Sequence, residues 1–95
     1  GRRLQITLLY FAGVRTAIAD EPESELLELP TVPFPLSALR ALLTTSVHPN
    51  NAELERVLER SGWSVDEEMI DPEQEHIVQL SGGETVCAIP PVSGG

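Results

Sequence analysis

The sequence predicts an α+β fold, and three observations support this class. Apolar and polar side chains alternate over residues 4–10, leucines recur at helical spacing over residues 36–43, and a second apolar strand pattern covers residues 84–89. Alternation is typical of a half-buried strand, whereas a spacing of three and four residues is typical of an amphipathic helix. Two N-terminal strands, a helix across the sheet and a returning last strand suit an α+β architecture.

The N-terminal segment is predicted to form two paired strands. The first covers residues 4–10, and its apolar face carries Leu4, Ile6, Leu8 and Tyr10. A loop is expected from Ala12 to about Glu23. Residues 25–29 form a second strand that pairs antiparallel with the first, and the prolines that follow end it.

The middle of the chain is predicted to form two helices. Residues 36–43 make the first, and Pro35 suits its first turn because a missing N–H costs nothing there. The second begins near Asn50 or Asn51, since either side chain can cap it, and Gly62 is well placed as its C-terminal stop. Its apolar stripe consists of Leu54, Val57 and Leu58.

Short strands and turns are expected in the C-terminal third. A third strand runs from Trp63 to about Ile70, with its anchors at Trp63, Val65 and Met69. After a loop, residues 76–80 form a short strand or turn. The glycines at 82 and 83 suit a tight turn before the last strand. The predicted order is therefore β-β-α-(α)-β-β-β.

Length and composition indicate one domain with a modest core. The 95 residues include fifteen acids and six bases, all of them arginine, so the net charge is −9. A basic footprint is absent and no apolar run could cross a membrane, so neither nucleic acid nor membrane is an expected partner. The acids either steer the chain toward a basic partner or only keep it soluble. With no secretory leader apparent and a single cysteine, we expect a cytoplasmic protein.

The chain ends in Pro90-Pro91-Val92-Ser93-Gly94-Gly95. Glycine lacks a Cβ, so a Gly-Gly end fits narrow passages that exclude side chains. Such an end suits an enzyme that activates a terminal carboxylate inside a pocket. The alternative interpretation is a loose end, because termini are often disordered and linkers are rich in glycine and serine. We divide the chain into a domain over residues 1–90 and a flexible tail over residues 91–95.

This tail resembles the C-terminus of the small subunit of molybdopterin synthase, a family of ubiquitin-like sulfur carriers. In that family the last strand runs into Pro-Pro, a hydrophobic residue, Ser or Thr, and Gly-Gly, and residues 84–95 follow this pattern. Near the other end, Tyr10-Phe11-Ala12 looks like the motif that closes the family's first strand. The interior matches only in its pattern, but the two motifs lie at the positions that the family requires.

The resemblance implies a β-grasp (ubiquitin-like) fold. Its mixed sheet would have four to five strands, with the first and last parallel and central, and one or two helices packed across it. The chain would be non-catalytic alone and would serve as the sulfur-donating subunit of a sulfurtransferase. A partner enzyme would use Mg-ATP to adenylate Gly95 and convert it to a thiocarboxylate. The thiocarboxylate would donate sulfur to a pyranopterin precursor and so form the molybdopterin dithiolene. No cofactor is expected on this chain itself.

The implied partners are the large subunit of molybdopterin synthase and an E1-like adenylating and sulfur-transferring enzyme. The family suggests a heterotetramer, with two small subunits on a dimer of large ones. Gly95 is the expected reacting residue, and Phe11 and Ile89 are candidates for an apolar docking patch, although a core position suits each equally well. The tail residues expected to bind the partner are Gly94, Ser93, Val92, Pro91 and Pro90.

Other residues that could carry chemistry favour structural interpretations. Cys87 lies mid-strand without a base nearby in sequence, so we expect a packed, inert thiol. His48 and His76 lack partners at ligand spacing, so no metal is assigned, and His48 is expected to be exposed in a loop. The acidic clusters at residues 67–68 and 73–75 are expected to form a solvated face.

Two other functions stay open at this level. A sulfur carrier for thiazole synthesis or tRNA thiolation would share the fold and the Gly-Gly end, although Pro-Pro-Val-Ser before the glycines favours molybdopterin synthesis. A non-catalytic ubiquitin-like modifier or interaction domain is the other alternative. The chain contains no lysine, so it could donate its C-terminus to another protein but could not receive an isopeptide on its own side chains.

Overall fold

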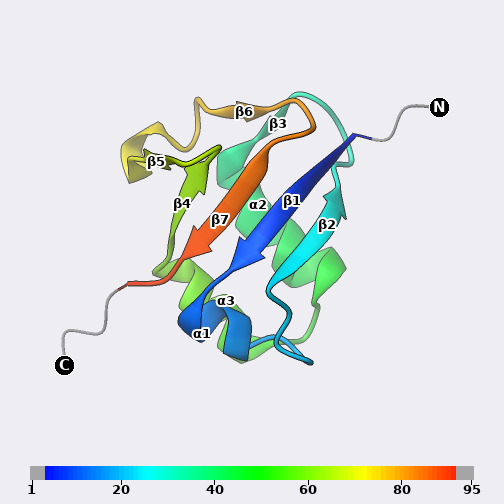
Figure 1. Cartoon of the computed structure of the whole chain (residues 1–95), viewed down its shortest axis with the longest axis vertical. Helices are drawn as coiled ribbons and strands as arrows, with labels where there is room; N and C mark the ends of the chain where they lie inside the picture. Colours follow the sequence, from blue (N-terminus) through cyan, green and yellow to red (C-terminus); the bar gives the residue numbers. More distant parts are fainter. Residues whose placement is uncertain (1–3, 92–95) are drawn as a thin grey trace.

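The computed structural model describes residues 4–91, which form a five-stranded mixed sheet with helices packed on one face (Figure 1). The strand order is β2-β1-β7-β4-β5, and β3 and β6 form a separate two-stranded sheet. The elements are β1 (Gln5–Tyr10), α1 (Ala12–Thr16), β2 (Ser24–Glu28), β3 (Phe34–Pro35), η1 (Leu36–Ala38), α2 (Leu39–Leu42), η2 (Leu43–Val47), α3 (Ala52–Glu59), β4 (Gly62–Val65), β5 (Glu68–Ile70), η3 (Pro72–Gln74), β6 (Gln79–Leu80) and β7 (Thr85–Ile89).

The first and last strands are parallel and central, as the resemblance implied. Leu8 lies opposite Val86 and Tyr10 lies opposite Ala88 across the β1–β7 pair. Strand β2 pairs antiparallel with the outer side of β1, and β4 pairs antiparallel with the outer side of β7. Because parallel strands end at the same edge of a sheet, the exit of β7 lies beside the end of β1.

The core lies between the helices and one face of the sheet. Alternate residues of β1 are buried, in agreement with the predicted period of two, and the structure shows the same alternation in β7. The leucines of both helical segments pack against these buried strand residues, and so does the predicted anchor Trp63. Residues with at most 1% exposure are Ile6, Leu8, Val14, Leu36, Leu39, Leu43, Leu54, Leu58, Trp63, Leu80, Val86 and Ala88.

A short helix, α1, occupies the segment that was expected to be a loop. The N–H of Val14 is bonded to the carbonyl of Phe11 at 3.1 Å, and Val14 is fully buried. Gly13 lies against α3, since a Cβ at this position would lie 3.4 Å from Cγ2 of Val57, which is an ordinary van der Waals distance. The loop prediction was wrong here because five residues are too few to show helical periodicity.

The single strand predicted over residues 63–70 is also wrong, because the chain forms a β4–β5 hairpin. Asp66 and Glu67 both have positive φ, at 49° and 72°, which is the backbone of a tight two-residue hairpin turn. The Asp66 carboxylate also accepts a hydrogen bond from the Thr85 N–H at 2.9 Å. The turn places Met69 opposite Ser64 on the open face, so Met69 is 63% exposed rather than a core anchor.

The predicted helices are present with shifted ends. The first runs without a break through η1, α2 and η2, and Pro35 lies in β3 just before it. The Asn51 side chain caps α3 by accepting a hydrogen bond from the Leu54 N–H at 3.0 Å. Helix α3 ends at Glu59, and Gly62 belongs to β4 rather than to a helix stop.

Arg40 joins the helices to the C-terminal half of the sheet. Its guanidinium donates to the carbonyls of Leu58 at 2.8 Å and Ser61 at 2.5 Å. It also binds both carboxylate oxygens of Glu75, at 2.6 and 3.2 Å, and lies 5.3 Å from the centre of the Trp63 ring. Glu75 was expected on a solvated face, but it is 8% exposed. This ion pair, which links positions 35 residues apart, accounts for its burial.

A second polar cluster connects β1, β2 and the end of η2. The Tyr10 hydroxyl donates to Oε1 of Glu25 at 2.6 Å, and Nε2 of His48 lies 2.7 Å from the same oxygen. His48 is therefore half-buried against β2, not exposed in a loop as expected. Burial raises the pKa of Tyr10 far above its ordinary value, and the hydrogen bond to Glu25 and its negative charge raise it further.

This shift predicts a coupled alkaline transition. The folded phenol holds its proton more tightly than the unfolded one, so its stabilisation is complete below about pH 10 and is lost as the pH rises further. Tyr10 is the single tyrosine, so tyrosinate absorbance reports this group alone. Above about pH 10 we expect tyrosinate to appear only together with the loss of far-ultraviolet circular dichroism. Ionisation near pH 10 with an unchanged circular dichroism spectrum would contradict this assignment.

Candidate functional site

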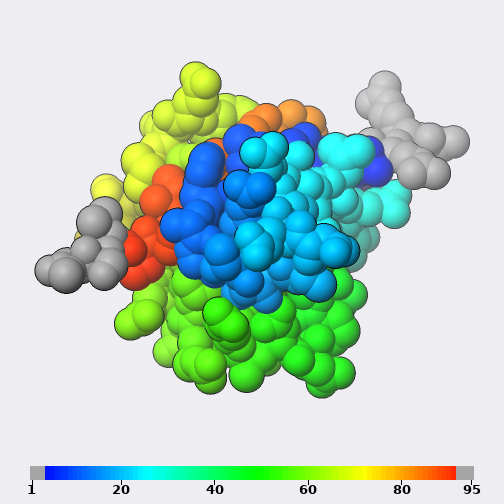
Figure 2. Space-filling view, turned by 60° about the horizontal axis from the view of Figure 1, so that its bottom comes forward, coloured from blue at the N-terminus to red at the C-terminus, as the bar shows by residue number. Residues whose placement is uncertain are grey.

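The ends of β1 and β7 form one corner of the molecule. Phe11 follows β1 and is 49% exposed, because the alternation that buries Tyr10 directs the next side chain to the opposite face. Ile89 ends β7 and is half-buried, and Pro90 and Pro91 follow it. Figure 2 shows the end of β7 beside the segment of β1 and α1, with α3 adjoining. Phe11 is thus a surface residue, and the core interpretation does not hold for it.

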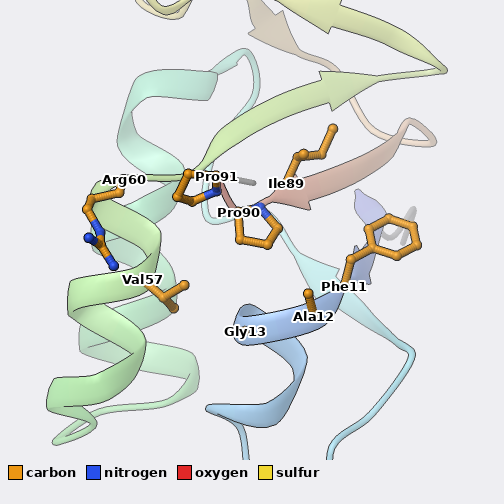
Figure 3. A pocket seen from close by; sticks show the side chains of 8 residues that line it. All are labelled: Phe11, Ala12, Gly13, Val57, Arg60, Ile89, Pro90 and Pro91. Atoms are coloured by element: carbon orange, nitrogen blue, oxygen red, sulfur yellow. The ribbon is translucent and has the colours of Figure 1, made fainter. Parts of the chain in front are cut away.

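A groove of about 660 Å³ opens at this corner. Figure 3 shows Phe11 and Ala12 on one side, Val57 of α3 and its C-cap Arg60 on the other, and the two prolines between them. Almost all of the lining is apolar. The full set of lining residues is Phe11, Ala12, Gly13, Val57, Arg60, Ile89, Pro90 and Pro91.

The open face of the sheet continues from this corner. Cross-strand pairing places Leu9 opposite Cys87, Cys87 opposite Ser64, and Ser64 opposite Met69. These four residues form a row across β1, β7, β4 and β5. Met69 is 63% exposed at one end of the row, so part of this face presents apolar side chains to solvent.

Cys87 is half-buried in this row. A hollow beside it is lined by Leu9, Asp66, Glu67, Thr85 and Cys87. The lining includes two acidic residues and no histidine that could serve as a base, which agrees with a structural thiol. Within residues 4–91, no three or more histidine, cysteine, aspartate or glutamate side chains gather as a metal site would need. None of the helices in the same range has the length and apolar character to cross a bilayer.

The structure brings four of the predicted site residues together, namely Phe11, Ile89, Pro90 and Pro91. Gly95, Gly94, Ser93 and Val92 lie outside the described residues. Sequence reasoning missed the opposite wall of the groove. Val57 was assigned to the apolar stripe of its helix, and the contact of Gly13 with α3 and the position of Arg60 carry no local signal.

Comparison with known proteins identifies the family. A molybdopterin synthase sulfur carrier subunit from Mycosarcoma maydis is 43% identical to this chain over 90 residues, which cover 95% of this chain and 92% of the relative. This chain belongs to the family of molybdopterin synthase sulfur carrier subunits. No protein-family model matches the chain, so the assignment rests on this relative together with the two sequence motifs.

The fold comparison agrees with the family of sulfur carrier subunits. A complex of subunits 1 and 2 of the molybdopterin-converting factor from Helicobacter pylori 26695 contains a chain that superposes with a TM-score of 0.62. The match covers 97% of this chain and 100% of that chain at 20% identity. This similarity confirms the β-grasp architecture with its mixed five-stranded sheet.

In a sulfur carrier subunit, the corner has a clear structural role. Strand β7 is held on both sides, by β1 and by β4, so Ile89 is a fixed point from which the chain leaves the domain. Pro90 and Pro91 have restricted φ angles and lack N–H donors, which ends sheet pairing at this point. The stem formed by Ile89, Pro90 and Pro91 therefore fixes the point at which the chain leaves the sheet.

Proposed function

We propose that this chain carries sulfur as a thiocarboxylate on Gly95 for the synthesis of molybdopterin. Family membership supports the sulfur carrier role. The observation that carries the proposal further is the stem at the corner, which exits from the centre of the sheet beside exposed Phe11. A chain built this way offers a thin terminal segment next to an apolar docking surface.

The proposed chemistry activates the Gly95 carboxylate in a partner enzyme. A free carboxylate resists nucleophilic attack because its carbonyl is electron-rich and its leaving group is poor. The carboxylate attacks the α-phosphate of Mg-ATP, releases pyrophosphate and forms a mixed anhydride. A sulfur donor then displaces AMP and leaves the thiocarboxylate. When the sulfur is delivered to the pyranopterin precursor, water hydrolyses the bond between the sulfur and the Gly95 carbonyl and so returns Gly95 to a carboxylate. The dithiolene requires two such deliveries.

The chain supplies the reacting carboxylate and its positioning, but no catalytic base. Gly94 would let the tail enter a narrow channel without a steric clash. Pro90 and Pro91 reduce the conformational entropy that is lost when the tail is bound. Ser93 and Val92 are proposed to contact the walls of the channel. The chain is accordingly inert alone and becomes part of a sulfurtransferase when it is bound.

Two partners are proposed to use the same corner in turn. The first is an E1-like adenylating and sulfur-transferring enzyme, and the second is the large subunit of molybdopterin synthase. The Helicobacter pylori neighbour comes from a complex of subunits 1 and 2, which supports a large-subunit partner here. We further propose a heterotetramer of two small and two large subunits that acts in the cytoplasm.

Phe11 is expected to contribute to docking on the large subunit. Replacing it by serine (Phe11→Ser) should weaken binding by about tenfold or more, because apolar anchors beside a central contact carry much of the binding energy. Stability should change little, since the side chain is half exposed. Isothermal titration calorimetry with the purified large subunit measures the affinity.

Ile77→Ser is the matched control for this experiment. Ile77 is 58% exposed and follows η3, so the same removal of apolar surface occurs outside the groove. Equal affinities for the two variants would contradict a docking role for Phe11.

Intact mass spectrometry tests the proposed function directly. The chain is incubated with the activating enzyme, Mg-ATP and a sulfur source, with a known carrier treated in parallel. The expected gain equals the mass difference between sulfur and oxygen. Adding the large subunit and the precursor should then yield molybdopterin and restore the original mass. Formation of an amide with a second protein, or no gain while the known carrier reacts, would favour a modifier or interaction domain instead.

A further inference from the structure

Of the four arginines among residues 4–91, two are paired with acidic residues and two are not. Arg15 donates to the carbonyl of Glu21 and lies 3.9 Å from a Glu23 carboxylate oxygen, and Arg40 is held by Glu75. Arg56 and Arg60 of the α3 region are exposed, and neither forms a salt bridge with any other residue in the range 4–91. Two cationic side chains therefore face solvent in a chain of net charge −9.

These two arginines lie next to the apolar groove. They are four residues apart, so they share one face of the α3 segment. Arg60 lines the groove opposite Phe11 (Figure 3), and a smaller hollow of about 300 Å³ is lined by Arg56, Glu59 and Arg60. Glu59 offsets one of the two charges among the residues that line this hollow, so the hollow keeps one net positive charge, while Glu53 and Glu55 lie in the first turn of α3.

Helix electrostatics explain only part of this arrangement. Cations near the C-terminus of a helix interact favourably with its dipole, and Arg56 lies in the last turn of α3 with Arg60 as its C-cap. The interaction with the dipole would be equally favourable if the arginines lay on any other face of α3. It does not account for a guanidinium that lines an apolar groove at the exit of the tail.

We propose that the groove, with Arg56 and Arg60 as its rim, binds an apolar side chain flanked by carboxylates on the large subunit of molybdopterin synthase. The inference rests on the proposed function and names the surface chemistry of that partner. Apolar side chains from Phe11, Val57, Ile89 and Pro90 match the apolar group, and the two guanidiniums match carboxylates, with which arginine forms paired hydrogen bonds. A positive rim on an otherwise acidic carrier would also orient the tail toward its channel during encounter.

A charge-matched pair of variants tests this docking site. The double variant Arg56→Gln/Arg60→Gln removes two positive charges at the rim. The control Gln74→Glu/Gln79→Glu adds two negative charges at exposed positions in η3 and β6, so both variants have the same net charge. Affinity for the large subunit is measured by calorimetry at low and high salt, and thermal unfolding checks that both variants fold.

The rim variant is expected to bind about tenfold more weakly than the parent at low salt. Its deficit should shrink at high salt, because added ions screen exposed charges. The control should bind like the parent. Equal losses in the two variants would attribute the effect to net charge and overturn the docking site.

The remaining outcomes separate this inference from the proposed function. If the parent binds the large subunit and the rim variant binds it equally tightly, the docking site is overturned but the proposed function is not. If sedimentation velocity shows that the parent is a dimer and the rim variant a monomer, the groove binds a second copy of the chain instead. If a parent chain truncated after Pro91 binds the large subunit more tightly than the full chain, the groove is occupied by the chain's own tail instead. A parent that does not bind the large subunit overturns the proposed partner and the docking site together.

Discussion

A chain extended by one alanine after Gly95 is expected to fold normally but to gain no sulfur. In the proposed mechanism the reacting group is the terminal carboxylate of Gly95. One added residue moves the terminal carboxylate by about 3.3 Å or more and places a Cβ on the reacting residue. A displacement of about 1 Å can already reduce a reaction rate about 100-fold, so the loss should be complete within detection.

Intact mass after incubation with the activating enzyme, Mg-ATP and a sulfur source measures this effect. An otherwise identical chain with one alanine added before Gly1 is the control, because it has the same composition and still ends at Gly95. Far-ultraviolet circular dichroism and thermal unfolding should be the same for both chains. An extended chain that still acquires sulfur at the parental rate would eliminate Gly95 as the reacting residue.

The substitution Arg40→Met is expected to lower the free energy of unfolding by about 3 kcal/mol, since removing one member of a buried ion pair leaves its partner uncompensated. The side chains of Arg40 and Glu75 are only 26% and 10% exposed. The substitution also leaves the carbonyls of Leu58 and Ser61 without their donor. Methionine keeps an apolar contact with Trp63, so the loss measures the polar interactions rather than a cavity.

Urea unfolding followed by the fluorescence of Trp63, the only tryptophan, measures the change. Arg15→Met is the matched control, because Arg15 and Glu23 are 42% and 82% exposed and 3.9 Å apart. Such surface pairs contribute about 0–1 kcal/mol. A double-mutant cycle with Glu75→Gln isolates the coupling between the two charges. An Arg40 variant that is no less stable than the Arg15 variant would show that the interaction has little energetic weight.

Local sequence patterns predicted the helices and strands that have a clear hydrophobic periodicity or a clear capping or breaking residue. The alternation in residues 4–10 identified β1, the apolar stretch after the glycine turn identified β7, and the leucine spacing identified the long helical segment. Asn50 and Asn51 were both predicted as possible caps, and Asn51 has that role. The failures are short elements. Helix α1 is too brief to show periodicity, and the Asp66–Glu67 turn uses positive φ angles without a glycine.

The candidate site divides in the same way. Pro90, Pro91, Ile89 and Phe11 were predicted because they belong to contiguous motifs at the two ends of the chain. Arg60 was not predicted, because its place in the groove depends on how α3 packs against α1 and lies beside the stem. The exposure of Phe11 was left open by the sequence, since an aromatic residue after a strand suits a core as well as an interface.

The sequence by itself determined the main strands and helices, the acidic charge and the family resemblance of both ends, because each of these depends on residues adjacent in the chain. Only the tertiary structure decided which of these segments meet. The parallel pairing of β1 with β7 brings Phe11 beside the stem, and the packing of α3 adds Arg60 to the same groove. The ion pair of Arg40 with Glu75 likewise joins residues 35 positions apart. Such contacts result from the packing of the whole core, so they cannot be predicted from the spacing of residues along the chain.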